Sequence, residues 1–260
     1  MSKLLKIIIC LSATLLICGN ILNAKGTNLY AVVTKIEGTV VFQPENSTKW
    51  HKAKTGLGLL KGDTLKTSVN SRIIIVIEGG TTFKIEQNTK IQIEALVTDF
   101  KSKKCEVGLN LPEKGSVYSS IPKNKKNRFS IKTPVCTASV RGTGLAVDVI
   151  DEETTSITVF EGKVIVKDFV AEAGLSADGN EMLLDFLHEI SMQADQTTTV
   201  TTKGINQPEK IKDNQLAQKE EFNKLKQESE NIQKSWNKTS FEKRNTDRNA
   251  VREEALSKGE

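Results

Sequence analysis

Short runs in which apolar and polar residues alternate recur through much of this chain and predict β-strands. From Leu145 to Val149 the residues Leu145, Val147 and Val149 fall on one face, with Ala146 and Asp148 on the other. Comparable runs begin at Leu29, Arg72, Lys90 and Ile157. Strands of about five residues at intervals of roughly ten are typical of a sandwich, a barrel or a β-solenoid. The pattern therefore predicts an all-β domain.

One short motif recurs where these strands are expected to bend. Ile36-Glu-Gly-Thr-Val-Val and Phe160-Glu-Gly-Lys-Val-Ile match closely, and Glu113-Lys-Gly-Ser-Val-Tyr is a looser copy. Their unequal separations exclude an array of fixed period. We interpret the motif as glycine placed where a strand changes direction.

The first 24 residues have the pattern of a secretory signal peptide. Lys3 and Lys6 precede an apolar run from Ile7 to Cys18, and Ala24 provides a small residue before Lys25. A membrane anchor is the alternative, although the run is short for a helix that must span about 20 residues. Lipidation at Cys18 is a further alternative, with the large Ile17 at a position where a small residue is preferred. We expect an exported protein without a transmembrane segment in the mature chain, located in the periplasm or cell envelope.

The rest of the chain divides into a β domain over residues 25–204 and a charged tail over residues 205–260. Residues 168–187 interrupt the β pattern as an insertion, in which residues 171–180 are loop-like and residues 181–187 form a short helix or an extra strand. In the tail, Pro208 and Glu209 indicate a helix start. A thin stripe of Phe222, Leu225, Ile232 and Trp236, broken by Ser229, either docks on the β domain or a partner or leaves the helix solvated. Beyond Arg244 we expect disorder.

Charge is unevenly distributed. The formal net charge is +5, and the segment from Lys101 to Arg128 alone has eight basic residues against Glu106 and Glu113, a net of +6. Such a segment either contacts anionic lipid headgroups or an acidic envelope polymer, or simply forms solvated connections. Residues 207–260 have twelve basic and eleven acidic groups, a balance unlike that of a nucleic-acid-binding arm. We therefore expect no nucleic-acid partner.

The residues that could carry chemistry are few. Cys105 and Cys136 either form a disulfide or remain buried thiols on neighbouring strands. Outside the signal segment the histidines are His51 and His188, and neither lies near a nucleophile motif. The glycine-rich run from Gly56 to Thr67 lacks the Gly-Lys-Ser/Thr ending of a phosphate-binding loop. We predict no catalytic residue, no metal site and no cofactor.

The most distinctive polar group in an apolar frame is Arg141-Gly142-Thr143. A guanidinium held between strands can clamp a carboxylate or a phosphate, which makes this a candidate interaction site. Alternatively, Arg141 satisfies strand-end carbonyls or pairs with an acid such as Asp148, while the glycines permit a bend. We interpret the cluster as a structural seam of the β domain and expect Arg141→Ala to lower thermal stability.

These residues also resemble a known family. Thr133-Pro134, then Val140-Arg-Gly-Thr-Gly-Leu-Ala-Val and Thr158-Val-Phe-Glu-Gly-Lys-Val, resemble the FecR domain, and Lys35-Ile-Glu-Gly-Thr-Val and Gly62-Asp-Thr-Leu-Lys-Thr extend the likeness. The resemblance covers roughly Leu29 to Thr202, with Leu145 at a position often aromatic and the insertion as departures.

The resemblance implies an all-β, solenoid- or roll-like extracytoplasmic module without catalytic residues. The founding member relays an iron-citrate signal through a membrane helix and a cytoplasmic segment, and we expect neither here. The expected function is non-enzymatic recognition of a protein or ligand in the bacterial cell envelope. The alternatives are a periplasmic component of a signalling relay linked to iron transport regulation, and a secreted enzyme of unknown type.

Overall fold

The computed structural model describes residues 31–77, 80–99, 104–123, 128–175, 181–186, 188–236 and 241–257. The expected signal peptide, with Cys18, lies outside these ranges, as do Lys101, Lys103, Lys125 and Lys126 of the basic segment.

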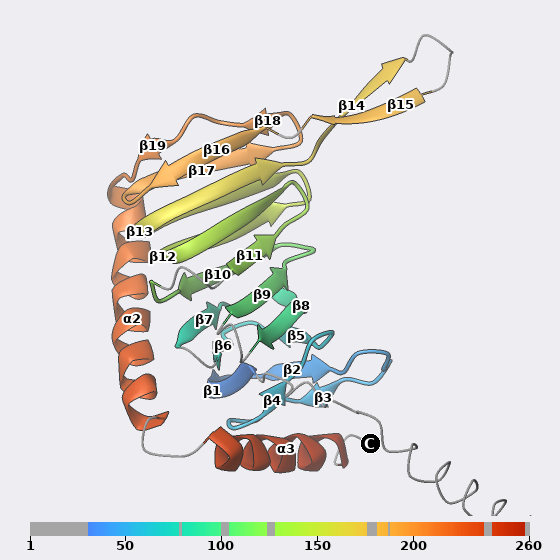
Figure 1. Cartoon of the computed structure of the whole chain (residues 1–260), viewed down its shortest axis with the longest axis vertical. Helices are drawn as coiled ribbons and strands as arrows, with labels where there is room; N and C mark the ends of the chain where they lie inside the picture. Colours follow the sequence, from blue (N-terminus) through green and yellow to red (C-terminus); the bar gives the residue numbers. More distant parts are fainter. Residues whose placement is uncertain are drawn as a thin grey trace, which may run out of the picture.

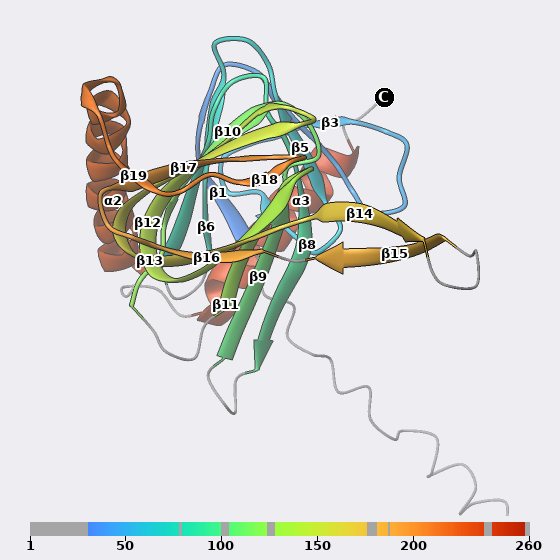
Figure 2. The same ribbon diagram turned by 90° about the horizontal axis from the view of Figure 1, so that it is seen from above.

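Strand pairing builds one curled sheet with two walls (Figures 1 and 2). The first wall contains, in order of pairing, β4 (Gly58–Leu59), β1 (Ala31–Glu37), β6 (Arg72–Ile77), β7 (Thr81–Ile85), β10 (Gly115–Ser120), the second half of β12 (Cys136–Asp151), the first half of β13 (Thr154–Asp168) and β17 (Gln196–Thr201), with β18 (Gly204–Ile205) and β19 (Glu209–Lys210) on its edge.

The second wall contains β3 (His51–Lys52), β2 (Val40–Gln43), β5 (Thr64–Thr67), β8 (Lys90–Asp99), β9 (Lys104–Asn110), β11 (Arg128–Lys132), the first half of β12, the second half of β13 and β16 (Glu189–Gln193). All these pairs are antiparallel except β9 with β11. The long strands β12 and β13 run through both walls and join them.

The space between the walls holds the main apolar core. Residues from the first wall such as Val33 and Ile75 are fully buried together with Phe42, Leu65 and Ile93 from the second. One face of each wall is thus removed from water, which explains the alternation in the sequence. The prediction of an all-β, roll-like domain is confirmed.

The repeated glycine motif marks places where the chain changes wall. Gly38, with φ of 74°, separates β1 from β2, and Gly162, with φ of 81°, lies at the crossing point within β13. Gly115 begins β10 after β9 of the other wall. The motif therefore marks a bend within a strand at Gly162, and a change of wall between two strands at Gly38 and Gly115.

The insertion forms strands. β14 (Val170–Leu175) and β15 (Glu181–Phe186) pair only with each other and project as a hairpin from the end of β13 (Figure 1). Of the two forms expected for residues 181–187, the strand is the one adopted over Glu181–Phe186, whereas the loop expected from residue 171 is wrong up to Leu175, which belongs to β14.

Two helices follow a short 3₁₀ turn, η2 (Asp213–Gln215). α2 (Leu216–Trp236) runs along the outer face of the first wall and contacts β7, β10 and β12 (Figure 1). Phe222, Leu225 and Ser229 are its buried residues. The apolar stripe therefore docks on the β domain, and the solvated alternative is wrong for this helix. No helix in the described part of the chain is long and apolar enough to cross a membrane.

α3 (Phe241–Ser257) lies against β3 and β4 at one end of the roll (Figure 1). The expectation of disorder beyond Arg244 is wrong, because this helix carries a buried anchor. Arg252 is 8% exposed and forms a two-pronged ion pair with Asp63, with Nη1–Oδ2 and Nη2–Oδ1 distances of 2.6 and 2.9 Å. It also donates a hydrogen bond of 2.9 Å to the carbonyl of Gly58. A mostly polar helix is thus fixed by a buried ion pair, together with the packing of Ala255, Val251 and Leu256 against the main core.

We expect Arg252→Ala to lower the free energy of unfolding by about 3–5 kcal/mol, because it leaves the carboxylate of Asp63 buried without its cation. Urea unfolding followed by circular dichroism measures this. Glu254→Ala is the control, since the Lys54–Glu254 pair of 3.0 Å is exposed and is expected to contribute at most about 1 kcal/mol. Equal effects of the two substitutions would show that Arg252 does not anchor α3.

Candidate functional site

The Arg141-Gly-Thr cluster lies where β12 and β13 pass from one wall to the other. Their pairing register shifts between Arg141 and Gly144. Gly142 adopts φ of 62°, and a Cβ there would lie 2.8 Å from the Cα of Lys123. The hydroxyl of Thr143 lies 3.1 Å from the carbonyl oxygens of both Arg141 and Lys163. Gly142 and Thr143 therefore form a β-bulge that turns the strand, as expected of a structural seam.

Gly144 has a separate purpose. A Cβ at this position would lie 2.0 Å from the ring of Phe222. That ring stacks on Phe160 at a centroid distance of 5.1 Å, and Phe160 in turn stacks on Tyr118 at 6.5 Å. Because Gly144 has no side chain, it leaves the space in which Phe222 of α2 packs on the first wall.

Arg141 itself points away from the core and belongs to a row of cations. It is in register with Lys163 on β13. Because Phe129 pairs with Val140, the preceding residue Arg128 lies beside Arg141. All three cations are exposed, and within the described part of the chain no ion pair joins any of them to a carboxylate. Like charges opposite one another on paired strands destabilise a sheet.

A second row, of two hydroxyl side chains and one apolar side chain, lies next to the row of cations. Ser130 pairs with Ser139, and Ser139 pairs with Ile165, two positions along each strand from the cations. Together the two rows line a groove of about 580 Å³ on the outer face of the second wall, with Glu106 at one end. We call this the cationic groove. It is an open, basic surface that can bind an anion through charge-assisted hydrogen bonds.

The suggested pair of Arg141 with Asp148 does not form. Asp148 lies on the first wall beneath α2, where it accepts hydrogen bonds from the hydroxyl of Ser116 and, at 3.1 Å, from the side chain of Gln218. Burial raises the pKa of Asp148, and these hydrogen bonds offset only part of that effect. The two halves of the cluster thus differ: Gly142 and Thr143 are structural, whereas Arg141 is available to a ligand.

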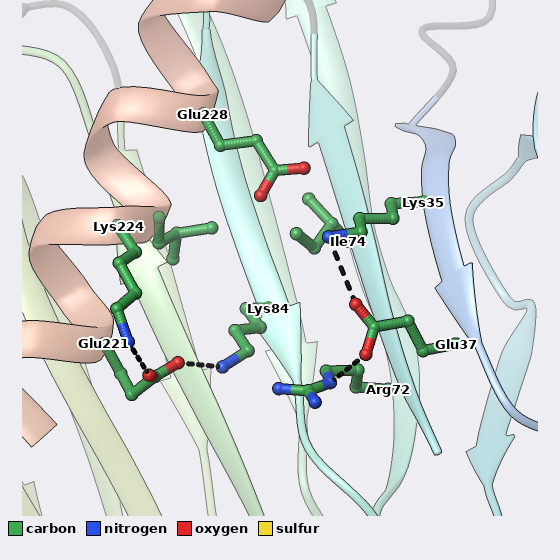
Figure 3. Close-up of a pocket in the computed structure, with 9 residues that line it drawn as sticks. Lys35, Glu37, Arg72, Ile74, Lys84, Glu221, Lys224 and Glu228 are labelled. Carbon is green, nitrogen blue, oxygen red and sulfur yellow. Dashed lines mark hydrogen bonds and ion pairs between the residues drawn. The ribbon is translucent and has the colours of Figure 1, made fainter.

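A second pocket, of about 210 Å³, lies between α2 and strands β1, β6 and β7 (Figure 3). Its charged side chains mostly pair with one another. Glu221 of α2 contacts Lys84 at 2.8 Å and Lys224 at 2.7 Å, and Glu37 contacts Arg72 at 2.6 Å. We interpret this pocket as an ionic clamp that holds α2 against the first wall.

The pKa values agree with such a clamp. Hydrogen bonds from Lys224 and Lys84 lower the pKa of Glu221 to about 2. Burial works against the charged form of Lys84, but hydrogen bonds to Glu221 and Glu86 outweigh it and raise its pKa. Both groups are therefore charged at neutral pH, and their charges pair with each other within the protein.

The cysteines do not form the disulfide that was one of the two alternatives. Cys105 and Cys136 are both buried as thiols. Strand β11 lies between them: Cys105 precedes Glu106, which pairs with Arg128, whereas Cys136 precedes Thr137, which pairs with Lys132. The two sulfurs therefore lie near opposite ends of β11, too far apart for a bond.

Cys136 does lie beside an acid and a histidine, an arrangement that the sequence did not indicate. It pairs with the fully buried Asp168, which contacts Nδ1 of His188 at 3.3 Å. Burial raises the pKa of Cys136 to about 11, so the thiol is not ionised at neutral pH. His51 is also buried and packs on Phe42. No group of metal-binding side chains occurs among the residues that the structure describes.

Residues 63–165 match the family model described as FecR protein. The resemblance to the FecR domain is thus confirmed over these residues. The match includes the bulge and all the residues that line the cationic groove. It is narrower than the span from Leu29 to Thr202 expected from the motifs. No curated protein matches the chain.

Two crystal structures of one Parabacteroides distasonis protein, described as a "putative anti-sigma factor" and determined at 1.65 and 2.50 Å resolution, resemble the chain. Each has a TM-score of 0.42 and 13% sequence identity over 59% of this chain. The chain spans 62% of the length of that protein.

Sequence reasoning singled out Arg141 but missed Arg128 and Lys163 as its neighbours in the FecR domain. Alternation alone gives the outward face of each strand and leaves the register unknown. The one available signal was the hairpin: counting back from its turn at Glu152-Glu153, with Asp151 opposite Thr154, places Arg141 opposite Val164, one residue from Lys163.

We expect Arg141→Ala to change the free energy of unfolding by no more than about 0.5 kcal/mol, because its side chain is exposed among like charges. Gly142→Ala should cost about 1–3 kcal/mol, because it forces a side chain into a left-handed backbone. Thermal and urea unfolding of both variants test this. An equal loss in the two would restore the earlier expectation that Arg141 stabilises the seam.

Asp148→Asn is expected to stabilise the FecR domain at pH 7, because it removes a charge that burial disfavours and keeps the polar contacts with Ser116 and Gln218. A raised pKa in the folded state means that this advantage is absent below the unfolded pKa of about 3.9 and grows as the pH rises through the folded value. Melting temperatures measured from pH 3 to pH 8 check the sign. A gain at pH 3 as large as that at pH 7 would contradict it.

Proposed function

We propose that this protein is an exported, non-enzymatic FecR-type module that recognises an acidic ligand or protein partner in the bacterial cell envelope through the cationic groove. The observation that carries the proposal is the row of Arg128, Arg141 and Lys163, three adjacent exposed cations of which none forms an ion pair in the described structure, although Glu106 is in register beside Arg128. Since such a row costs stability, it favours a purpose outside the fold.

Two further features support recognition over catalysis. The buried thiol of Cys136 is not ionised at neutral pH, and the charges of the pocket beneath α2 are taken up by the ionic clamp. The FecR match favours a signalling or regulatory role for the recognition event, so a relay component in the envelope is the second candidate. The signal-peptide pattern of residues 1–24 supports export.

The proposal predicts where the protein is found and what keeps it there. In cell fractionation the wild type should appear outside the cytoplasm, with a native N-terminus at Lys25 for a soluble protein or at a lipidated Cys18 for an anchored one. Its association with isolated envelopes should weaken with added salt. The double variant Arg141→Glu, Lys163→Glu should lose most of this association.

Lys203→Glu, Lys210→Glu is the matched control, because it makes the same change of charge at exposed positions outside the groove. Equal envelope association of the wild type, the groove variant and the control would show that the groove is not the contact. An intact Met1 in a cytoplasmic fraction would show that the protein is not exported.

A further inference from the structure

The cationic groove offers side chains only, which limits the kind of ligand it can bind. β11 is paired on both sides, by β9 and β12, and β13 is paired by β12 and β16 at this level of the sheet. The backbone N–H and C=O groups of these strands are therefore already hydrogen-bonded to neighbouring strands. A peptide cannot add to this surface as an extra strand, so recognition depends on guanidinium, ammonium and hydroxyl groups.

The net charge of the groove is that of a site for a doubly charged anion. Arg128, Arg141 and Lys163 contribute +3 and Glu106 contributes −1, which leaves +2. Neighbouring strands are about 4.8 Å apart, so the three cations extend over roughly 10 Å. A phosphate monoester carries close to two negative charges at neutral pH on three oxygens attached to one atom. A ligand of this kind neutralises the groove over a short distance.

The donors also fit a phosphate group, whose third oxygen distinguishes it from a carboxylate. Each arginine presents a planar fork that matches two oxygens of a phosphate group, and lysine adds a point charge. The hydroxyls of Ser130 and Ser139 lie one row further along the strands and can donate to the same group. Beyond them Ile165 provides apolar surface against which the carbon part of an ester can pack. The volume of about 580 Å³ is that of a small-molecule site.

From these observations we infer that the cationic groove binds a phosphate monoester, with its phosphate on Arg128, Arg141 and Lys163 and its organic part over Ser139 and Ile165. The inference rests on the proposed function and specifies its ligand. A phosphorylated lipid headgroup and a soluble phosphorylated sugar share this chemistry.

Isothermal titration of the full-length protein at fixed ionic strength tests the ligand class. Glucose 6-phosphate should bind, and succinate, which carries the same charge on two carboxylates, should bind at least about tenfold more weakly. Arg141→Lys keeps the charge but removes the fork, and Lys163→Gln removes one charge. Each should weaken the binding of glucose 6-phosphate about tenfold or more. Lys203→Gln, which removes an exposed charge elsewhere, should bind like the wild type.

Sedimentation with vesicles distinguishes the two sources of the phosphate group. Stronger binding to phosphatidic acid vesicles than to glucose 6-phosphate identifies a lipid headgroup, and the reverse identifies a soluble ester. Phosphatidylglycerol vesicles, which carry a diester, should bind more weakly than phosphatidic acid at equal surface charge.

The inference is overturned if succinate binds as tightly as glucose 6-phosphate, if Arg141→Lys binds like the wild type, or if no phosphate ester binds. The proposed function has its own test. Should envelope association depend on the groove while phosphate esters fail to bind, only the ligand class is wrong. Should envelope association be independent of the groove, the proposed function is wrong as well.

Discussion

The whole architecture depends on the point where β12 and β13 cross between the walls. At this bulge Gly142 turns the strand, and the hydroxyl of Thr143 is hydrogen-bonded to the neighbouring carbonyls. Gly162 lies opposite on β13, where a Cβ would come within 2.6 Å of the carbonyl oxygen of Gly142. Without the crossing, the two longest strands would continue in one plane and the two walls could not enclose a common core. The four consecutive residues from Arg141 to Gly144 thus serve different needs, since Arg141 faces solvent on one wall while Gly144 leaves room for Phe222 on the other.

The two outer faces of the roll consequently have opposite characters. On the first wall, α2 covers an apolar cluster that includes Tyr118, Phe160 and Leu225, and ion pairs at its margin neutralise the nearby charges. On the second wall, the cationic groove is left without a covering element in the described structure. The same bulge keeps the two faces distinct, because it determines which side chains of β12 and β13 point outward on the first wall and which point outward on the second.

Alternation in the sequence was sufficient for the class of fold and for the glycine bends, because strand periodicity and positive φ are local properties. It could not give α3, whose mostly polar sequence is held by the contact of Arg252 with Asp63, a residue far away in the chain. The space left by Gly144 and the row of cations beside Arg141 were missed for the same reason. Each depends on register or on the packing of segments distant in sequence, and an alternating pattern contains neither.

The anchor of α3 also determines when folding can finish. Asp63 is buried near the start of the roll, and its partner Arg252 is separated from it by 189 residues. During synthesis the early strands therefore exist with an uncompensated carboxylate and an uncovered end of the core until the last helix leaves the ribosome. Contacts of such long range slow folding. The end of the core next to Asp63 is therefore completed only when residues of α3 pack against it.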